Sequence, residues 1–192
     1  AGPEKSVAAT KSYLATLSGL LQLTAYWSKN NELISALDSL PEALSKAIDA
    51  PAQLTIDGLA DTRNLVVLGR GLGYAVSKEI ALKLKEVCSI HAEAFSSAEF
   101  LHGPVTLVAQ KLTIVDCHVN DESDKSHKEQ IIEVKSRGAD LIHLQQIVND
   151  VHPRLAPLLV LQRFYLDVEQ VALAKGFNPD EPQGLKKVTR TL

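Results

Sequence analysis

Two acidic residues and one histidine have the types and spacing to move protons. Glu79 and Glu86 lie seven residues apart in the run Glu-Ile-Ala-Leu-Lys-Leu-Lys-Glu. That separation is about two helical turns, so on a helix both carboxylates would point the same way. His102 comes directly before Gly-Pro, in a turn that would fix the direction of its imidazole. Two acids and a directed imidazole are suited to proton transfer on a sugar.

Lys83 gives the two acids a purely structural alternative. It lies four residues after Glu79 and three residues before Glu86, and these are the spacings at which helical ion pairs form. Spacing alone favours this ion-pair interpretation, with both acids on a solvated helix edge. The alternative is catalysis, and a carboxylate suits proton transfer when burial lifts its pKa toward neutrality.

The helix that carries these acids belongs to a predicted strand-helix unit. Apolar residues at helical spacing predict a helix over 76–87 with one face in the core. Residues 64–68 form an apolar run that ends at Gly69, which is typical of a buried parallel strand followed by a glycine turn. Further strands are expected at 90–94, 111–117 and 139–144, and further helices at 97–101, 124–137 and 153–175. This alternation predicts an α/β fold with a doubly wound, mostly parallel sheet.

The first 60 residues have a helical pattern. Apolar residues recur at spacings of three and four over 6–28, which predicts a long helix with Ser6 as its N-cap. A second helix is expected over 32–48, with a kink or break at Pro41, and a short third helix within 53–60. The chain is therefore interpreted as one domain with N-terminal helices in 6–60, a sheet region in 64–176 and a polar tail in 177–192.

A glycine-rich turn follows the first predicted strand. Gly69, Gly71 and Gly73 invite a dinucleotide-binding interpretation, with Glu93 as the acid that would bind the ribose. The third glycine of that fingerprint is absent at the required spacing, which disfavours a nicotinamide cofactor. A glycine turn at the strand ends more often serves another ligand, so Gly69 and Gly71 are candidates for substrate binding and no cofactor is expected.

Composition excludes several classes of partner. The 192 residues are 45% hydrophobic, which is enough for the core of a single domain. A net charge of −3 without a basic stripe argues against nucleic acid, and no apolar run is long enough to predict a membrane span. Cys88 and Cys117 lie in or beside apolar runs, as buried free thiols do, so we expect a reducing, cytoplasmic location. The six histidines show no metal-ligand spacing, and no metal site is expected.

The motifs occur together in the order found in one protein family. The segments 68–71, 79–86, 91–94 and 101–104 resemble the second sugar-isomerase (SIS) domain of two-domain phosphosugar enzymes. Those enzymes include the glucosamine-fructose-6-phosphate aminotransferases, through their isomerase half, and the SIS-type glucosamine-6-phosphate deaminases. The resemblance covers nearly the whole chain, from Ala-Gly-Pro-Glu at residue 1 to Leu-Lys-Lys at 185–187. It implies an SIS-type sheet of four to five strands flanked by helices, with an N-terminal helical pair.

The resemblance implies roles for individual residues. Glu86 would be the base that moves a proton between C1 and C2 of the sugar, and Glu79 would orient its neighbours. His102 would help to open the sugar ring, reaching the site of a neighbouring subunit. Lys187 would contact the open-chain sugar, or Lys186 if the tail is shifted by one residue. Substrate contacts are expected from the backbone of Val7, Ala8 and Ala9.

Several family features are missing or altered. The family's Ser/Thr-rich phosphate loop belongs to the first SIS domain, and Ser96 and Ser97 are poor substitutes. Ala9 replaces a hydroxyl residue of the aminotransferases, and the fifth strand, expected within 145–152, is shortened or lost. Because the opening motif lies in mid-chain in the relatives, we expect a fragment of a two-SIS-domain protein, with a processed single-domain protein as the alternative. The long apolar helices expected at 6–28 and 153–175 predict that the domain packs against another SIS domain or forms a homodimer.

The expected substrate is a hexose 6-phosphate. The opening and closing motifs favour deaminating isomerisation of glucosamine 6-phosphate to fructose 6-phosphate and ammonia. Two alternatives remain: the isomerase half of a glutamine:fructose-6-phosphate aminotransferase, and a non-catalytic sugar-phosphate-binding regulatory domain.

Overall fold

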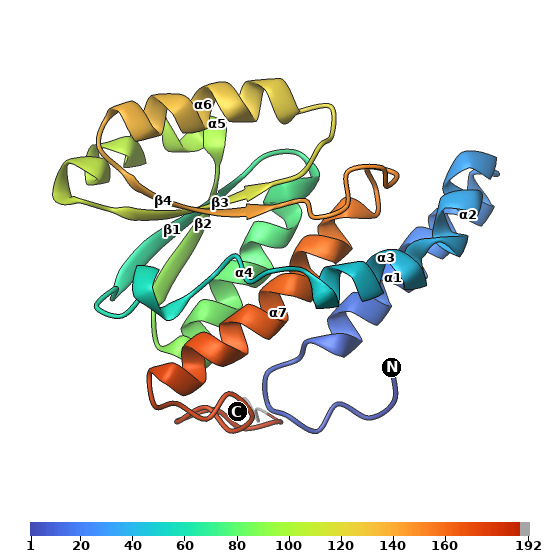
Figure 1. Ribbon diagram of the computed structural model, residues 1–192, viewed down its shortest axis with the longest axis horizontal. Coiled ribbons are helices and arrows are strands. Elements are labelled where there is room, and N and C mark those ends of the chain that lie inside the picture. Colours follow the sequence, from blue (N-terminus) through green and yellow to red (C-terminus); the bar gives the residue numbers. More distant parts are fainter. Residues whose placement is uncertain (189–192) are drawn as a thin grey trace.

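A computed structural model describes residues 1–188 and shows one parallel four-stranded sheet (Figure 1). The strands are β1 (Asn64–Gly69), β2 (His91–Ser96), β3 (Thr113–His118) and β4 (Asp140–Gln145), in the order β2-β1-β3-β4. Each strand begins within two residues of its predicted start. The predicted α/β class with a doubly wound parallel sheet is confirmed.

Helices cover both faces of the sheet, in two layers (Figure 1). One face carries α4 (Leu72–Cys88) and α7 (Ala156–Ala174); the other carries α5 (Ser97–Phe100), the 3-10 helix η2 (Pro104–Gln110) and α6 (Asp124–Ser136). Successive strand residues point to opposite faces, so Leu65 and Val67 of β1 enter the larger core under α4 and α7. Val66 and Leu68 enter the smaller core under α5, η2 and α6. The two faces are therefore separate chemical environments.

The first helix starts later than predicted. Helix α1 spans Lys11–Trp27, and Ser6 is not its N-cap. The Glu4 carboxylate takes the capping role from a distance, since it accepts the backbone N–H groups of Thr10 (3.2 Å) and Ser12 (2.9 Å). The Ser6 hydroxyl instead donates to Asp180 in the C-terminal tail (2.5 Å).

The predicted second helix is two helices, and the predicted third is almost absent. Helices α2 (Asn31–Asp38) and α3 (Leu40–Asp49) meet just before Pro41, so the predicted break is confirmed. Between α3 and β1 the described helical structure is the 3-10 helix η1 (Ile56–Gly58), so the short helix expected within 53–60 is present only as one 3-10 turn. The N–H groups of Gln53 and Leu54 donate to the Asp167 carboxylate on α7 (2.9 and 3.2 Å), which holds these two residues in a bend.

Strand β4 is an edge strand, because the described residues that follow it form a loop leading into α7. The expected loss of a fifth strand is confirmed for the described part of the chain. The side chain of Gln53 pairs with the backbone of Gln145 instead: the Gln145 N–H donates to Oε1 (2.9 Å) and Nε2 donates to the Gln145 carbonyl (3.2 Å). This amide imitates a neighbouring strand at one position of the edge. Within residues 1–188, no helix has the length and apolar character needed to cross a membrane.

Candidate active site

Helix α4 presents a row of three charged side chains toward α7 and the N-terminal segment. Lys83 Nζ lies 3.3 Å from Glu79 Oε1 and 2.6 Å from Glu86 Oε2, so both predicted ion pairs are present. The prediction that these residues lie on a solvated helix edge is wrong for Glu79 and Lys83, which are 6% and 3% exposed. Glu86 keeps about a quarter of its side chain exposed (24%), so it is the acid of the row that a substrate can reach.

Glu79 is held inside the row by a second donor. The Tyr165 hydroxyl on α7 donates to Glu79 Oε1 (2.8 Å). Burial raises the pKa of Glu79, and this outweighs the lowering effects of Lys83 and Tyr165. Burial and the neighbouring Glu79 charge also raise the pKa of Tyr165. Glu79 is therefore suited to hold Lys83 in position and not to contact a substrate itself.

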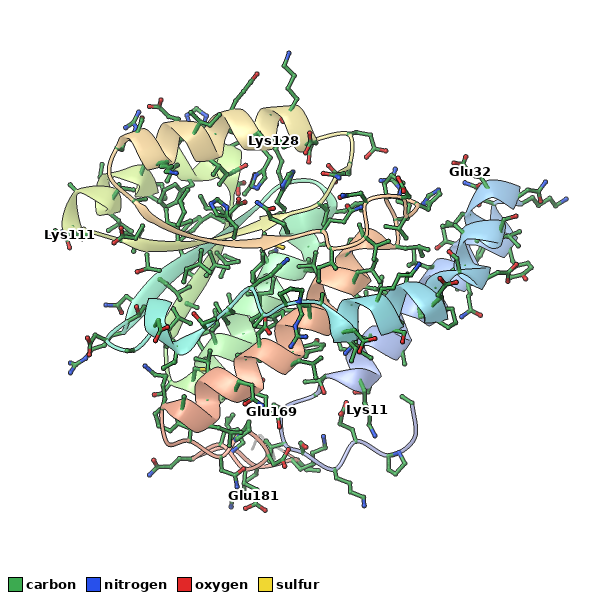
Figure 2. All side chains as sticks on the ribbon, in the orientation of Figure 1. Lys11, Glu32, Lys111, Lys128, Glu169 and Glu181 are labelled. Atoms are coloured by element: carbon green, nitrogen blue, oxygen red, sulfur yellow. The ribbon has the colours of Figure 1, made fainter. Side chains whose placement is uncertain are left out.

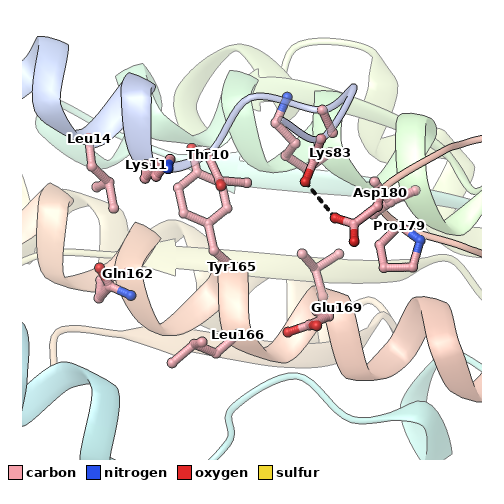
Figure 3. A pocket seen from close by; sticks show the side chains of 14 residues that line it. Thr10, Lys11, Leu14, Lys83, Gln162, Tyr165, Leu166, Glu169, Pro179 and Asp180 are labelled. Atoms are coloured by element: carbon pink, nitrogen blue, oxygen red, sulfur yellow. Dashed lines mark hydrogen bonds between the residues drawn. The ribbon is translucent and has the colours of Figure 1, made fainter. Parts of the chain in front are cut away.

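A cavity of about 280 Å³ lies beside Lys83, the central residue of this row (Figure 3). Its walls come from four parts of the chain: the N-terminal segment and the start of α1, then α4, α7 and the tail. Lys83, Tyr165 and Asp180 are among its lining residues. The N-terminal segment and the tail are joined by a bond from Val7 N–H to the Asp180 carbonyl (2.9 Å). The N-terminal segment and the tail thus meet beside Lys83.

The predicted substrate-contacting segment lies at this cavity. Ala8 lines it, between its neighbours Val7 and Ala9. The backbone N–H of Val7 is bonded to the tail, so it can reach a ligand only if that bond exchanges. The contacts of these three residues with a substrate stay a prediction.

The tail lysine reaches the same corner of the molecule. Lys187 Nζ donates to the carbonyl oxygen of Ser6 (2.6 Å). Burial raises the pKa of Glu4, but hydrogen bonds from Ser12 and Thr10 and the charge of Lys187 make the net shift downward. Glu86 faces an adjoining cavity of about 390 Å³ whose other walls include Phe177 and Glu181 of the tail. The tail therefore lies beside both Glu86 and the N-terminal segment.

His102 lies elsewhere in the molecule. It is exposed, in the turn between α5 and η2, and these two elements cover the face of the sheet opposite α4. One copy of the chain does not bring His102 to Glu86. A role for His102 at this site requires the imidazole of a neighbouring copy, and that role stays a prediction.

The glycine turn has a packing explanation. A Cβ at Gly69 would lie 2.4 Å from Ser77 Oγ, and one at Gly71, where φ is +52°, would lie 2.4 Å from Asp121 Oδ2. Asp121 accepts the Leu72 N–H at the start of α4 (2.7 Å), which is where an anionic ligand would bind. Ligand contacts of Gly69 and Gly71 remain a prediction and would require Asp121 to move.

The sequence predicts Lys83 only as an ion-pair partner of the two acids. The structure shows it as the centre of the row, buried and lining the cavity. A signal for this was present, since Lys83 lies three residues after Ile80 and seven after Val76 and therefore continues the apolar stripe of α4. A lysine on the core-facing side of a helix is unusual unless it is paired.

The two cysteines, Cys88 and Cys117, are buried free thiols, as predicted. Burial raises the pKa of each thiol to about 12. Among residues 1–188, no cluster of three or more His, Cys, Asp or Glu side chains is arranged to hold a metal ion.

Residues 58–153 match the family model of the SIS domain. The chain belongs to the SIS-domain family. The isomerizing glutamine–fructose-6-phosphate aminotransferase of Thermotoga maritima is 33% identical over 211 residues, which cover 97% of this SIS chain and 35% of that protein. A putative phosphosugar isomerase from Silicibacter pomeroyi is similar in structure, with 36% identity, a TM-score of 0.82, and coverage of 94% of this chain and 58% of that one.

The C-terminal domain of glucosamine-fructose-6-phosphate aminotransferase from Francisella tularensis has 30% identity and a TM-score of 0.75, covering 93% of the SIS chain and 57% of its own. The SIS chain thus spans about a third of the curated relative and little more than half of each solved structure. These relatives confirm the SIS fold and the relation to phosphosugar isomerases.

Proposed function

We propose that this SIS domain carries the proton-transfer site of an enzyme that acts on hexose 6-phosphates. The reaction is the deaminating isomerisation of glucosamine 6-phosphate to fructose 6-phosphate and ammonia. The observation that supports it is the row Glu79–Lys83–Glu86, in which the buried Lys83 is paired with the partly exposed carboxylate of Glu86. This row lies beside two cavities, one lined by the N-terminal segment and the tail and the other by the tail.

Glu86 would act on the open-chain aldehyde form of the amino sugar. Its carboxylate takes the proton from C2 while the aldehyde oxygen gains a proton from water, which gives an enolamine. The carboxylate then returns its proton to C1 while the amino nitrogen gives a proton to water. The product is an imine at C2; water adds to it and ammonia leaves, so fructose 6-phosphate is formed. Lys83 fixes the direction of the Glu86 carboxylate through their 2.6 Å contact, and a base held in one direction is effective in proton transfer.

The other predicted site residues would position the sugar. Lys187 would exchange its bond with the Ser6 carbonyl for one with the sugar carbonyl oxygen. The segment of Val7, Ala8 and Ala9 would contact the sugar through its backbone, and His102 of a neighbouring copy would open the ring. The phosphate would be held mainly by another SIS domain, because Ser97 is fully buried and its hydroxyl lies 2.5 Å from Gln130 Oε1.

Helix α1 supports an assembly of this kind. Its outer surface exposes large apolar side chains, among them Leu23, Tyr26 and Trp27, and Trp27 is 82% exposed. Exposed apolar surface on a projecting helix marks a contact with another protein surface. We propose that another SIS domain, or a second copy, covers it. Sedimentation as a monomer at micromolar concentration would count against this assembly.

The aminotransferase reaction is the second candidate, because the similar curated proteins carry that name. The same proton transfer between C1 and C2 serves that reaction in the opposite direction, with ammonia delivered from glutamine. The geometry of the row suits both reactions. A regulatory domain would keep the cavity but would need no base.

The test is an assay of the full protein with glucosamine 6-phosphate in the absence of glutamine. We expect fructose 6-phosphate and ammonia in equal amounts. Glu86→Gln should reduce the rate at least about a hundredfold. Glu129→Gln, at an exposed position of α6, is the control and should leave the rate unchanged. Glucosamine 6-phosphate formed only from fructose 6-phosphate and glutamine would establish the aminotransferase instead, and binding without turnover would support the regulator.

A further inference from the structure

A second cavity, of about 470 Å³, lies on the face of the sheet opposite the row of α4. It is bounded by α6, by the carboxyl ends of β3 and β4, and by the loop after β4. Figure 2 shows Lys128, one of its lining residues, on the α6 side of the sheet, while Lys11 and Glu169 of the first cavity lie on the other side. The two cavities share no lining residue, so this one is independent of the proposed function.

A buried carboxylate forms the base of this cavity. Asp116 of β3 is 4% exposed and receives two imidazoles: His127 Nε2 lies 2.7 Å from Oδ1, and His143 Nδ1 lies 2.8 Å from Oδ2. Burial raises the pKa of Asp116, but the hydrogen bonds and charges of the two histidines make the net shift downward. Asp116 is therefore an ionised acceptor, and both ring nitrogens that face it donate.

The two histidines differ in what they can offer a ligand. His127 is buried and uses both nitrogens, because its Nδ1 lies 2.9 Å from Ser97 Oγ. The side chain of His143 is 42% exposed and lines the cavity. Because Nδ1 of His143 is directed to Asp116, its Nε2 is left for a ligand, and this nitrogen accepts a hydrogen bond when the ring is neutral and donates one when it is protonated. An imidazole oriented by a buried carboxylate is thus accessible from this cavity.

The remaining lining groups indicate what would bind. Three carboxamides that can both donate and accept contribute to the wall: Asn120, Gln145 and Asn149. A fourth, that of Gln146, is already bonded to the Asn120 N–H (2.9 Å) and to the Val148 carbonyl (2.8 Å). Ile131 and Ile132 add an apolar side. The nearby acids are already paired, Asp116 with the two histidines and Asp124 with His118 (2.5 Å) and Lys128 (2.9 Å). The site therefore lacks a strong charge of either sign and is rich in groups that match hydroxyls.

We propose that this cavity binds a polyhydroxylated small molecule, a sugar or sugar alcohol. One of its hydroxyls donates to Nε2 of His143, others bond to the carboxamides, and its C–H face packs against Ile132. The size agrees, since small-molecule sites are about 300–1,000 Å³. Because the ligand reaches only His143 of the two Asp116-bound histidines, His127 serves to hold α6 on the sheet.

The experiment is saturation-transfer NMR of the full protein with sorbitol, an uncharged polyol. We expect saturable binding that His143→Ala weakens about tenfold, the effect of losing one hydrogen bond to a polar site. His143→Gln, whose amide oxygen can accept, should recover part of the loss. Glu86→Gln should bind sorbitol as the natural protein does, which separates this site from the proposed active site.

Three results would overturn the proposal. Sorbitol could show no saturable binding, it could bind equally well to His143→Ala, or inorganic phosphate could bind at His143 while sorbitol does not. Far-UV circular dichroism of each variant checks that it is folded. His143 lies on the edge strand with its side chain partly in solvent, so its replacement should not prevent folding.

Discussion

The two faces of the sheet each carry a charged network, and the networks are built differently. Glu79, Lys83 and Glu86 come from consecutive turns of one helix, with an acid on each side of a buried cation. Asp116, His127 and His143 come from β3, α6 and β4, with an imidazole on each side of a buried anion. The residues of the first network are close in sequence and those of the second are not. The central group is a cation in the first network and an anion in the second.

This inversion gives the two networks opposite dependence on pH. Burial raises the pKa of Glu79, whereas the histidines bring the net pKa of Asp116 below its usual value. A buried ion pair is costly to desolvate, and removing one partner leaves the other charge uncompensated. Replacing the central residue of each network, Lys83 or Asp116, should therefore lower the free energy of unfolding more than replacing either of its partners.

The largest effect is expected from Lys83→Met. The change leaves the buried Glu79 and the nearby Glu86 without their shared cation, and we expect a loss of about 3–5 kcal/mol in the free energy of unfolding. Urea denaturation at pH 7 measures it. The matched control is Lys46→Met, which removes the exposed pair with Glu42 on α3 and should cost less than about 1 kcal/mol. An equal loss of unfolding free energy in the two variants would mean that the buried ion pairs of α4 stabilise the protein no more than an exposed pair does.

Asp116→Asn should come next, with a loss of about 2–3 kcal/mol at neutral pH, because hydrogen bonds to a charged group are removed. The folded pKa of Asp116 is below its ordinary value of 3.8. Its stabilisation is therefore present above that value and is lost as the pH falls through the folded pKa. Urea denaturation between pH 6 and the acid limit should show a shallower acid decline for the variant. Parallel curves would show that folding does not lower the pKa of Asp116.

Glu79→Gln should give a smaller change of opposite sign in its pH dependence. The folded pKa of Glu79 is above its ordinary value of 4.5, so the folded state keeps the proton longer and stability falls as the pH rises through this window. The variant keeps an acceptor for Tyr165 and has no titrating group, so it should lose less stability over the same rise. A decline as steep as that of the natural protein would assign the effect to another acid.

The difference between the networks also explains what the sequence could predict. The row on α4 followed from spacing, since helical neighbours are fixed by the 3.6-residue repeat. Asp116 and His143 are opposite each other in the register of β3 and β4, and register between parallel strands depends on packing that is not visible in one sequence. The burial of Lys83 was missed for a related reason, because α7 and the N-terminal segment that cover it are distant in the chain.

The fold was predictable where the pattern was periodic. The four strands and the helices between them followed from alternating apolar runs. The first helix does not start at Ser6, because the Glu4 carboxylate outside the helix accepts the Ser12 N–H at its true start. The helix within 53–60 is only one 3-10 turn, because Asp167, far along the chain, accepts the Gln53 N–H. The capture of an N–H by a tertiary partner leaves no local signal.

The smallest effect is expected at the edge of the sheet, where Gln53 pairs with the backbone of Gln145. Gln53→Ala removes two hydrogen bonds and should cost about 1 kcal/mol, measured by urea denaturation. It also uncovers the backbone of an edge strand, which favours pairing with another chain, so sedimentation should show more association as concentration rises. Gln53→Glu keeps the acceptor for the Gln145 N–H and loses the donor, so its effect should be intermediate. Gln110→Ala, at an exposed position, is the control, and if Gln53→Ala behaved like it, the edge would be protected by something other than this amide.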